Sequence, residues 1–342
     1  MKLKNKEILK IKVAESDRKT INYRVTEKCN YKCPYCWFPN RLPINLEADF
    51  SAISKVQQNL RYVVDYYIKQ GQKVDLFLTG GEPSLYPLNF YDNLFKLIEE
   101  KKIDKLTLST NFSADPKWFK DFSKKCRGKV FFVIKAAFHP SECKINEYIE
   151  KIKEVKDCAD KFIAHFTFDD NNFIGIDEIN KIKALGVNLD VVAIHSKRKQ
   201  DYGKYKISNP DLIDLVAESK KESKIYTICY KDGSTEEITS SDIKNMDFSR
   251  LKPVCHHTNI TIMFNKIGIN CEYMRSVQKV VFENWMDISI DRTQKELYDY
   301  LKNKCSIVCD KKMVEQGNNC KPTVLEFSQN SLLKKLSKLI LK

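Results

Sequence analysis

The chain alternates between short apolar runs and longer segments whose apolar residues recur every three to four positions. The runs have the length of buried strands and predict strands at 20–26, 74–78, 105–109, 130–138, 162–168 and 187–194. The periodic segments predict helices at 52–70, 88–101, 116–125, 143–155 and 174–185. Strands that alternate with helices of this length form a parallel sheet. We therefore expect an α/β fold, built as an open (βα)6 partial TIM-like barrel.

The predicted strand at 162–168 has two distinct faces. Phenylalanine and alanine occupy its even positions, whereas His165 and Thr167 occupy odd positions. Because side chains alternate across a strand, we expect the phenylalanine face to pack beneath the helices and His165 to point into the barrel. His165 is therefore a candidate site residue. His139, at the end of the fourth strand, and His195, after the sixth, are weaker candidates; the alternative for each is an ordinary interior or loop histidine.

Three cysteines lie in one short segment where the first strand ends. Cys29, Cys33 and Cys36 have the spacing C-x3-C-x2-C, with Tyr35 immediately before the last thiol. Three thiolates can ligate three corners of a cubane iron–sulfur cluster, whereas a cluster held entirely by protein normally takes four. Such a loop leaves one iron open for a non-protein ligand. The alternative is a zinc knuckle, but zinc sites of this type usually pair C-x2-C units or include histidine.

Two further motifs follow the next two strands. The first consists of Gly80, Gly81, Glu82 and Pro83, and the second of Ser109, Thr110 and Asn111. Paired glycines permit positive φ and let the backbone approach a ligand without interference from a Cβ atom. Ligands in open α/β sheets and barrels bind at the carboxyl ends of the strands, which is where these motifs and the cysteine segment fall.

The cysteine triplet followed by Gly-Gly-Glu-Pro resembles the radical S-adenosylmethionine (radical SAM) family. The resemblance covers roughly residues 18–245 and implies a partial-barrel core domain over that range. It also implies a [4Fe-4S] cluster on Cys29, Cys33 and Cys36. In that family, S-adenosylmethionine chelates the remaining iron through its amino and carboxylate groups.

The same resemblance implies roles for residues around the cofactor. Glu82 would receive the methionine amino group, Asn111 would reach the ribose, and Tyr35 would lie near the adenine. The other positions that it places beside the cofactor are Gly80, Gly81, Pro83, Ser109, Thr110 and Ile194. The chain departs from the family pattern at Phe112, where glycine is usual, and at 136–137, where two alanines replace polar residues. His139 is a candidate for the missing ribose contact.

Five more cysteines lie toward the C-terminus: Cys255, Cys271, Cys305, Cys309 and Cys320. Two apolar arms at 260–270, around residues 265–268, predict a β-hairpin between the first two cysteines. This arrangement resembles the Twitch/SPASM extension, here at 250–325. The resemblance implies one auxiliary [4Fe-4S] cluster on the first four cysteines, with Cys320 as an alternative ligand or a spare thiol. A zinc site that includes His256 or His257 is the alternative.

Composition narrows the class of protein. The 59 basic and 45 acidic residues give a net charge of +14, but only 9 of the basic residues are arginine and no aromatic-interleaved basic stripe occurs. Nucleic acid is therefore not the expected partner, and RNA modification is a minor option. No segment is long and apolar enough to span a bilayer, and the charged N-terminus does not fit a signal peptide. Twelve cysteines then favour a cytoplasmic location and metal binding over disulfides.

Two features remain outside the predicted sites. Cys126, Cys143, Cys158 and Cys229 have no spacing that suggests a common site, so we expect them to be buried as small hydrophobic residues.

The tail at 326–342 has the pattern of a basic amphipathic helix, with leucines on one face and lysines on the other. Residues 331–342 can contact a membrane surface or a protein, although packing on the helix's own domain is the commoner outcome.

The family resemblance implies reductive cleavage of S-adenosylmethionine and abstraction of a substrate hydrogen atom, with a flavodoxin- or ferredoxin-type electron donor. The auxiliary cluster would serve as an electron acceptor or conduit. Fewer than 20 residues precede the first barrel strand, which leaves no room for the N-terminal peptide-binding domain of many peptide-modifying relatives. We therefore expect a small-molecule substrate such as a sugar. The alternatives are a peptide- or protein-modifying enzyme and a non-enzymatic iron–sulfur or zinc scaffold that binds a partner.

Overall fold

The computed structural model describes residues 8–13, 18–36, 57, 60–194, 208–219, 225–239, 253–255, 259–263, 266–270 and 324–327. The chain divides into two compact units. The larger comprises Lys19–Lys221 and Thr261–Ile267. The smaller comprises Met1–Arg18, Glu222–Ile260 and Gly268–Lys342.

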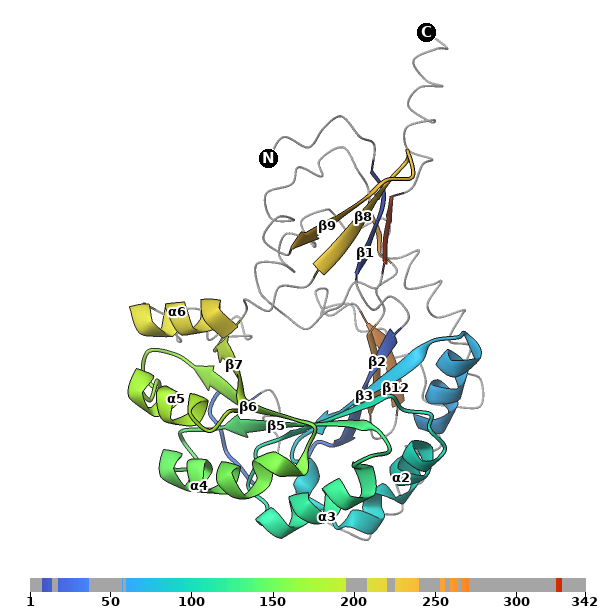
Figure 1. Cartoon of the computed structure of the whole chain (residues 1–342). Coiled ribbons are helices and arrows are strands. Elements are labelled where there is room, and N and C mark those ends of the chain that lie inside the picture. The colour runs from blue at the N-terminus through green and yellow to red at the C-terminus, as the bar shows by residue number, and fades with distance from the viewer. Residues whose placement is uncertain are drawn as a thin grey trace. The chain divides into compact units, whose positions relative to one another are not determined.

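The larger unit is built on a curved, open sheet (Figure 1). Its central strands are β2 (Arg18–Thr26), β3 (Lys73–Gly80), β4 (Lys105–Thr110), β5 (Phe131–Phe138), β6 (Lys161–Phe168) and β7 (Asn188–Ala193). They are neighbours in chain order, and β3 to β7 pair in parallel. The sheet ends at β7 and does not close. The α/β partial barrel expected from the alternation of strands and helices is confirmed.

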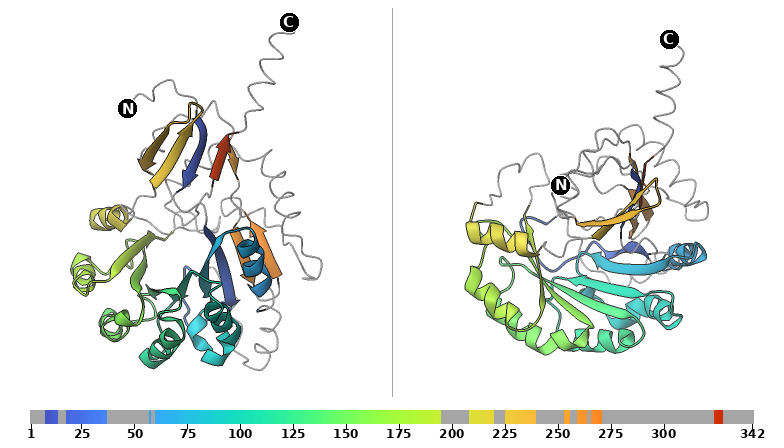
Figure 2. Two further views of the ribbon diagram at one scale, coloured as in Figure 1. Left: turned by 45° about the vertical axis from the view of Figure 1, so that its right-hand side comes forward. Right: turned by 45° about the horizontal axis from the view of Figure 1, so that its top comes forward.

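Helices α2 to α5 cover the outer side of this sheet (Figures 1 and 2). The helices are a segment at 60–69, α2 (Asp92–Glu99), α3 (Pro116–Cys126), α4 (Ile145–Val155), α5 (Ile176–Lys183) and α6 (Pro210–Ser219). Short 3-10 helices occur at η1 (Pro83–Leu85), η2 (Leu88–Tyr91) and η3 (Lys156–Cys158). The helix predicted at 88–101 is therefore divided between η2 and α2, and α6 was not predicted.

The start of α3 shows how local sequence sets a helix boundary. The Asp115 side chain accepts a hydrogen bond from the backbone N–H of Lys117, 2.7 Å away. Pro116 occupies the first helical position, where its missing N–H would have had no partner in the helix. The helix therefore begins at Pro116, the first residue of the predicted helix, directly after a capping aspartate.

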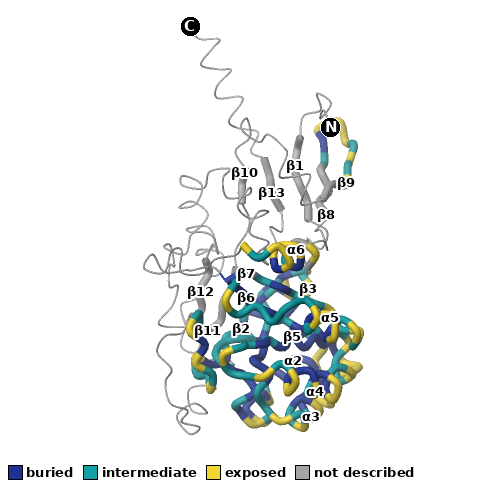
Figure 3. Tube along the Cα trace, turned by 90° about the vertical axis from the view of Figure 1, so that its left-hand side faces the viewer, coloured by how far each residue is buried: buried dark blue, intermediate teal, exposed yellow. Residues whose placement is uncertain are grey.

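The hydrophobic core of the larger unit lies between the sheet and its helices. Figure 3 shows buried residues along the strands and exposed residues on the outer turns of the helices. In β6 the residues that face the core and are buried are Phe162, Ala164, Phe166 and Phe168. His165 and Thr167, on the opposite face, are only partly buried. The predicted division of this strand into two faces is confirmed.

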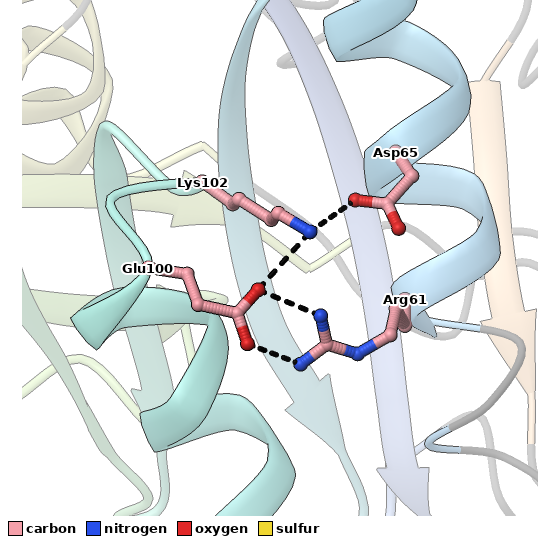
Figure 4. Close-up of polar contacts among 4 residues, drawn as sticks. All are labelled: Arg61, Asp65, Glu100 and Lys102. Atoms are coloured by element: carbon pink, nitrogen blue, oxygen red, sulfur yellow. Dashed lines mark hydrogen bonds and ion pairs between the residues drawn. The ribbon is translucent and has the colours of Figure 1, made fainter.

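An ion-pair network joins the helix at 60–69 to the turn after α2 (Figure 4). The Arg61 guanidinium donates two hydrogen bonds to the Glu100 carboxylate, at 2.7 and 2.8 Å. Lys102 Nζ lies 2.8 Å from Asp65 and 3.0 Å from Glu100. The hydrogen bonds from Arg61 and Lys102 lower the pKa of Glu100 to about 2. Because the four side chains are substantially exposed, water and salt screen the network and limit its effect on stability.

The large sheet continues beyond β2 with two strands from the C-terminal part of the chain. These are β11 (Asn259–Met263) and β12 (Lys266–Asn270), and the order at this edge is β12-β11-β2. The two apolar arms predicted for a hairpin are therefore adjacent strands. Strand β12 already begins at Lys266, so its start differs from the expected turn at 265–268.

The smaller unit contains a five-stranded sheet that was not predicted. Its strands, in spatial order, are β10 (Pro253–Cys255), β13 (Val324–Phe327), β1 (Ile8–Val13), β8 (Ile225–Tyr230) and β9 (Thr235–Thr239). The pairings are antiparallel. Strands β8 and β9 fall inside the range 18–245 covered by the family resemblance, but they belong to this second sheet.

Several predicted features lie outside the described residues. They are His195, His256, His257, Cys271, Cys305, Cys309, Cys320 and the tail at 331–342. Cys255 is the last residue of β10. Within the described part of the chain, no helix combines the length and the apolar character needed to cross a bilayer.

Candidate functional site

The cysteine segment leaves β2 at Thr26 and forms a loop that extends to Cys36. The Tyr31 backbone N–H donates to Cys29 Sγ at 3.4 Å, and the Cys36 N–H donates to the Cys33 carbonyl at 3.1 Å. Cys33 is buried, whereas Cys29 and Cys36 are partly exposed. Burial raises the pKa of the Cys29 thiol. The three thiols therefore share one hydrogen-bonded loop at the carboxyl end of a barrel strand.

The paired glycines pack the end of β3 against this loop. The N–H of Gly81 donates to the Thr26 carbonyl and the N–H of Glu82 donates to the Lys28 carbonyl, both at 2.7 Å. A Cβ atom on Gly80 would lie 2.1 Å from the Thr26 oxygen, and one on Gly81 would lie 2.0 Å from the Lys28 oxygen. Gly80 also has φ of +139°, which favours glycine. The close approach that these glycines permit is to the backbone of the cysteine loop.

Glu82 is fully buried, and donors from two turns surround its carboxylate. The backbone N–H and the hydroxyl of Ser84 donate to Oε1 at 2.8 and 2.6 Å, and the Thr110 hydroxyl donates to the same oxygen at 2.7 Å. The Asn111 N–H donates to Oε2. Burial raises the pKa of Glu82, while these hydrogen bonds favour the ionised form. The carboxylate thus ties the turn after β3 to the turn after β4. Its contact with a methionine amino group stays a prediction.

Asn111 completes the connection to the cysteine loop. Its side-chain amide donates to Asn30 Oδ1 at 2.9 Å and lies 3.5 Å from Cys29 Sγ. The next residue, Phe112, has φ of +61°, which is uncommon for a bulky side chain. Three segments that are distant in the sequence therefore meet at the carboxyl ends of β2, β3 and β4.

His139 lies against the cysteine loop. The Tyr35 hydroxyl and His139 Nδ1 are 3.0 Å apart, and the two rings are stacked with centroids separated by 6.0 Å. Tyr31 contacts the same imidazole edge-on. Burial, followed by repulsion from His165, lowers the pKa of His139 to about 4, so the imidazole is neutral at neutral pH. The structure thus brings this weak candidate next to Tyr35, whose predicted contact with the adenine stays a prediction.

His165 faces the interior of the barrel beside a charged pair from the two adjoining strands. Its Nδ1 lies 2.9 Å from Asp190 Oδ2, and Lys135 Nζ lies 2.5 Å from the same oxygen. The Thr167 hydroxyl is 3.3 Å from His165 Nε2. Burial opposes ionisation of Asp190, but His165 and Lys135 hold its pKa well below the usual range. Burial and Lys135 lower the pKa of His165, so the imidazole is neutral, with Nδ1–H directed at Asp190.

His165 is predicted from the sequence, whereas Lys135 and Asp190 are not. The register pairs His165 with Asp190 and Lys135 with Ile163, so the side chains of all three polar residues lie on the same face of the sheet. A single charged residue within an otherwise apolar strand is the signal that identifies both positions. The sequence alone does not show that the two charges meet at one histidine.

The remaining predicted site residues lie near strand ends. Ser109 is the penultimate residue of β4 and is partly buried. Pro83 begins η1 and is buried. Ile194 follows β7, is buried, and donates its N–H to the Phe168 carbonyl at 2.7 Å. All three therefore occupy the carboxyl side of the sheet, as expected for ligand-binding positions.

The four cysteines without a common site differ in burial. Cys126 is fully buried on the inner face of α3. The prediction was wrong for Cys143, Cys158 and Cys229, which are partly exposed. Cys143 precedes α4 and Cys158 lies in η3. These two positions are connections rather than core-facing elements, so one side of each thiol remains open to solvent.

The cysteine loop supplies three thiols, which is the donor set for a cubane cluster with one open iron. Among the residues with described side chains, no three histidine, cysteine or carboxylate groups are arranged to hold one ion. A cubane binds each cysteine at a different iron, so its ligands do not have to converge on one point. Asn111 Nδ2 beside Cys29 Sγ adds a hydrogen-bond donor of the kind that tunes cluster sulfurs.

Comparison with known proteins agrees with this geometry. Residues 23–127, which contain all three motifs, match the family model described as the Radical SAM superfamily. No match is found among curated proteins.

Solved structures add similarity of fold. Streptococcus suis SuiB bound to precursor peptide SuiA has a TM-score of 0.55 at 14% identity, over 85% of this chain and 68% of that chain. A second structure of Streptococcus suis SuiB has a TM-score of 0.53 at 16% identity, over 87% of this chain and 72% of that chain. Coproporphyrinogen III oxidase (HemN) from Escherichia coli is described as a radical SAM enzyme. It has a TM-score of 0.45 at 10% identity, over 88% of this chain and 80% of that chain. The two SuiB structures show a shared fold.

Proposed function

We propose that this chain, which carries a radical SAM domain at residues 23–127, is an enzyme that holds a [4Fe-4S] cluster on Cys29, Cys33 and Cys36. The observation that carries the proposal is the junction at which the glycine turn, the Thr-Asn turn and the cysteine loop are bonded together. With one electron from an external donor, the bound cluster would supply reductive cleavage of the S–C5′ bond of S-adenosylmethionine and, through the adenosyl fragment, abstraction of a substrate hydrogen atom.

The chain's own residues bind and orient the cofactor in this proposal. Gly80 and Gly81 hold β3 close to the cysteine loop, and the buried Glu82 carboxylate fixes the turn that carries Asn111. We assign Asn111 to the ribose and Tyr35 to the adenine. The positions that we assign to the remaining surroundings of the cofactor are Pro83, Ser109, Thr110 and Ile194. Their placement at the carboxyl side of the sheet supports this assignment.

We also propose that the interior wall formed by Lys135, His165, Thr167 and Asp190 faces the substrate. The imidazole Nε2 is an acceptor, the lysine ammonium has further donor capacity, and the ion pair leaves the wall without a large net charge. Such groups suit the hydroxyl groups of a small molecule such as a sugar. A peptide substrate is the alternative, and the structure of SuiB bound to its precursor peptide supports that alternative.

The C-terminal cysteines extend the proposal. We infer that Cys255, Cys271, Cys305 and Cys309 hold one auxiliary [4Fe-4S] cluster, with Cys320 as an alternative ligand, and that a flavodoxin or ferredoxin supplies electrons. The support for this cluster is the cysteine spacing around strands β11 and β12. After anaerobic reconstitution we expect about eight iron per chain with an auxiliary cluster and about four without one.

The decisive experiment is cleavage of S-adenosylmethionine by anaerobically reconstituted protein reduced with dithionite. We expect 5′-deoxyadenosine and methionine as products. The variant Cys36→Ala should lose this activity. The control variant Cys126→Ala should keep it, because it removes a thiol of α3 that lies outside the cysteine loop. A wild-type protein that holds iron but forms no 5′-deoxyadenosine would support the alternative of a non-enzymatic scaffold.

A second experiment tests the substrate wall without knowledge of the substrate. The variant His165→Ala should still form 5′-deoxyadenosine in the absence of substrate, because its imidazole contacts Asp190 and Thr167 rather than the cysteine loop. Loss of that cleavage at unchanged iron content would place His165 in the cofactor site and refute its assignment to the substrate wall.

A further inference from the structure

The turn after β4 has a backbone conformation that requires support. Phe112 has φ of +61°, and the only other described non-glycine residue with positive φ is Lys101. A bulky L-residue in the left-handed region is disfavoured and persists where its surroundings hold it. Glycine would adopt this conformation freely, but the chain has phenylalanine here. The surroundings of the turn therefore explain why it is retained.

A single lysine from α4 supplies polar support. Lys151 Nζ donates to three consecutive backbone carbonyls: Phe112 at 3.0 Å, Ser113 at 3.2 Å and Ala114 at 3.1 Å. An ammonium group has three donors, so all of them are engaged by this one turn. The ammonium also lies 5.6 Å from the centroid of the Phe112 ring. Three backbone carbonyl oxygens of the turn therefore converge on the Lys151 ammonium group.

The ring of Phe112 receives apolar support from α3, α4 and β6. It is 3% exposed and packs against Phe119 at 4.9 Å, Tyr148 at 5.8 Å and Phe162 at 5.7 Å between ring centroids. Tyr148 and Lys151 are three residues apart on α4, which places them on one face of the helix. Helix α4 thus contacts both the ring and the carbonyls of the turn, while α3 and β6 complete the packing around the ring.

This turn carries the groups that reach the other two motifs. Thr110 Oγ1 donates to Glu82, and Asn111 Nδ2 reaches Asn30 Oδ1 and lies beside Cys29 Sγ. Because Asn111 is bonded directly to Phe112, a shift of the 112–114 carbonyls displaces it. Lys151 touches none of the predicted cofactor residues itself, so its influence on them passes through the backbone.

We propose that Lys151 is a positioning residue of the S-adenosylmethionine site, which holds the Thr110–Asn111 turn in binding geometry at a position occupied by phenylalanine instead of glycine. The proposal rests on the function proposed above. It assigns to a helix on the outer side of the sheet a role in cofactor affinity that the motifs do not reveal.

The test compares Lys151→Met with Lys151→Arg and with Lys153→Met in cluster-loaded protein. Lys153 lies on the same helix, is exposed, and forms an ion pair with Glu150 one turn earlier. For Lys151→Met we expect about a tenfold larger Kd for S-adenosylmethionine by anaerobic calorimetry, equivalent to about 1.4 kcal/mol. Arginine can also donate to several carbonyls, so Lys151→Arg should recover most of the affinity. Lys153→Met should match the wild type.

Two further measurements separate positioning from general stability. The KM for S-adenosylmethionine in substrate-free cleavage should rise in Lys151→Met while kcat changes little. Amide hydrogen exchange in the peptide that covers 110–114 should accelerate in Lys151→Met and not in Lys153→Met.

The proposal is overturned if Lys151→Met binds S-adenosylmethionine as tightly as the wild type, or if Lys153→Met loses the same affinity. Unchanged amide exchange at 110–114 in Lys151→Met overturns it as well. This measurement needs no bound S-adenosylmethionine, so it decides the question where the methionine variant loads too little cluster for calorimetry. A wild-type protein that does not bind S-adenosylmethionine refutes the proposed function itself. That outcome is distinct from a wild type that binds and a variant that is unaffected.

Discussion

Replacing Gly81 with alanine tests whether close packing of two backbones builds the site. The added Cβ would lie 2.0 Å from the Lys28 carbonyl oxygen and 2.5 Å from its carbon, whereas real Cβ contacts are essentially never shorter than 3.0 Å. The turn must therefore move by roughly 1 Å, since backbone atoms on both sides have little freedom to relax. Gly81 does not have positive φ, so the effect is steric rather than conformational.

The displacement breaks the two hydrogen bonds that join the segments. These are Gly81 N–H to Thr26 and Glu82 N–H to Lys28, each 2.7 Å long. At about 1 kcal/mol net for each bond, Gly81→Ala should lower the free energy of unfolding by about 2 kcal/mol or more. It should also reduce the cluster content and the affinity for S-adenosylmethionine, because the cysteine loop loses its support.

Urea unfolding of the cluster-free, reduced chain measures the first effect, and iron content after reconstitution measures the second. Gly128→Ala is the matched control. Gly128 has φ of +76° with open space where an added Cβ would lie, so alanine there brings only backbone strain of roughly 1 kcal/mol and should leave iron content unchanged. If Gly81→Ala keeps wild-type stability and a full cluster, the reasoning from close approach is refuted.

Three further predictions concern charge. Glu82→Gln places an amide NH2 among donors that need an acceptor, and we expect a loss of about 1–3 kcal/mol in urea unfolding; a wild-type midpoint would contradict this. His139 has a folded pKa of about 4 against an ordinary 6.5, so the unfolded chain binds its proton first as the pH falls. Stability of the cluster-free chain should decline by up to about 3 kcal/mol between pH 6.5 and 4, and a His139→Gln variant that declines equally would exclude this cause. Arg61→Ala should lower the melting temperature only slightly, and a difference that persists in about 1 M salt would contradict a screened Arg61–Glu100 interaction.

Much of the core fold could be predicted because its signals are local. The alternation of apolar runs with helical periodicity predicts six strands in the correct places, since each buried strand must be apolar whatever its neighbours are. The face of β6 that carries His165 follows from strand geometry alone. The spacing of Cys29, Cys33 and Cys36 indicates cluster chemistry because three thiols on one short loop remain close together in any fold.

The tertiary structure decided which distant residues meet. Asp190 and Lys135 converge at His165 only through the register of three strands, and Lys151 reaches the Phe112 turn only because α4 packs beside it. The second sheet combines strands from both ends and the middle of the chain, and no local pattern predicts such pairing. Contacts between residues far apart in sequence depend on how the whole chain packs, so a motif alone shows the chemistry of a site but not the network that holds it.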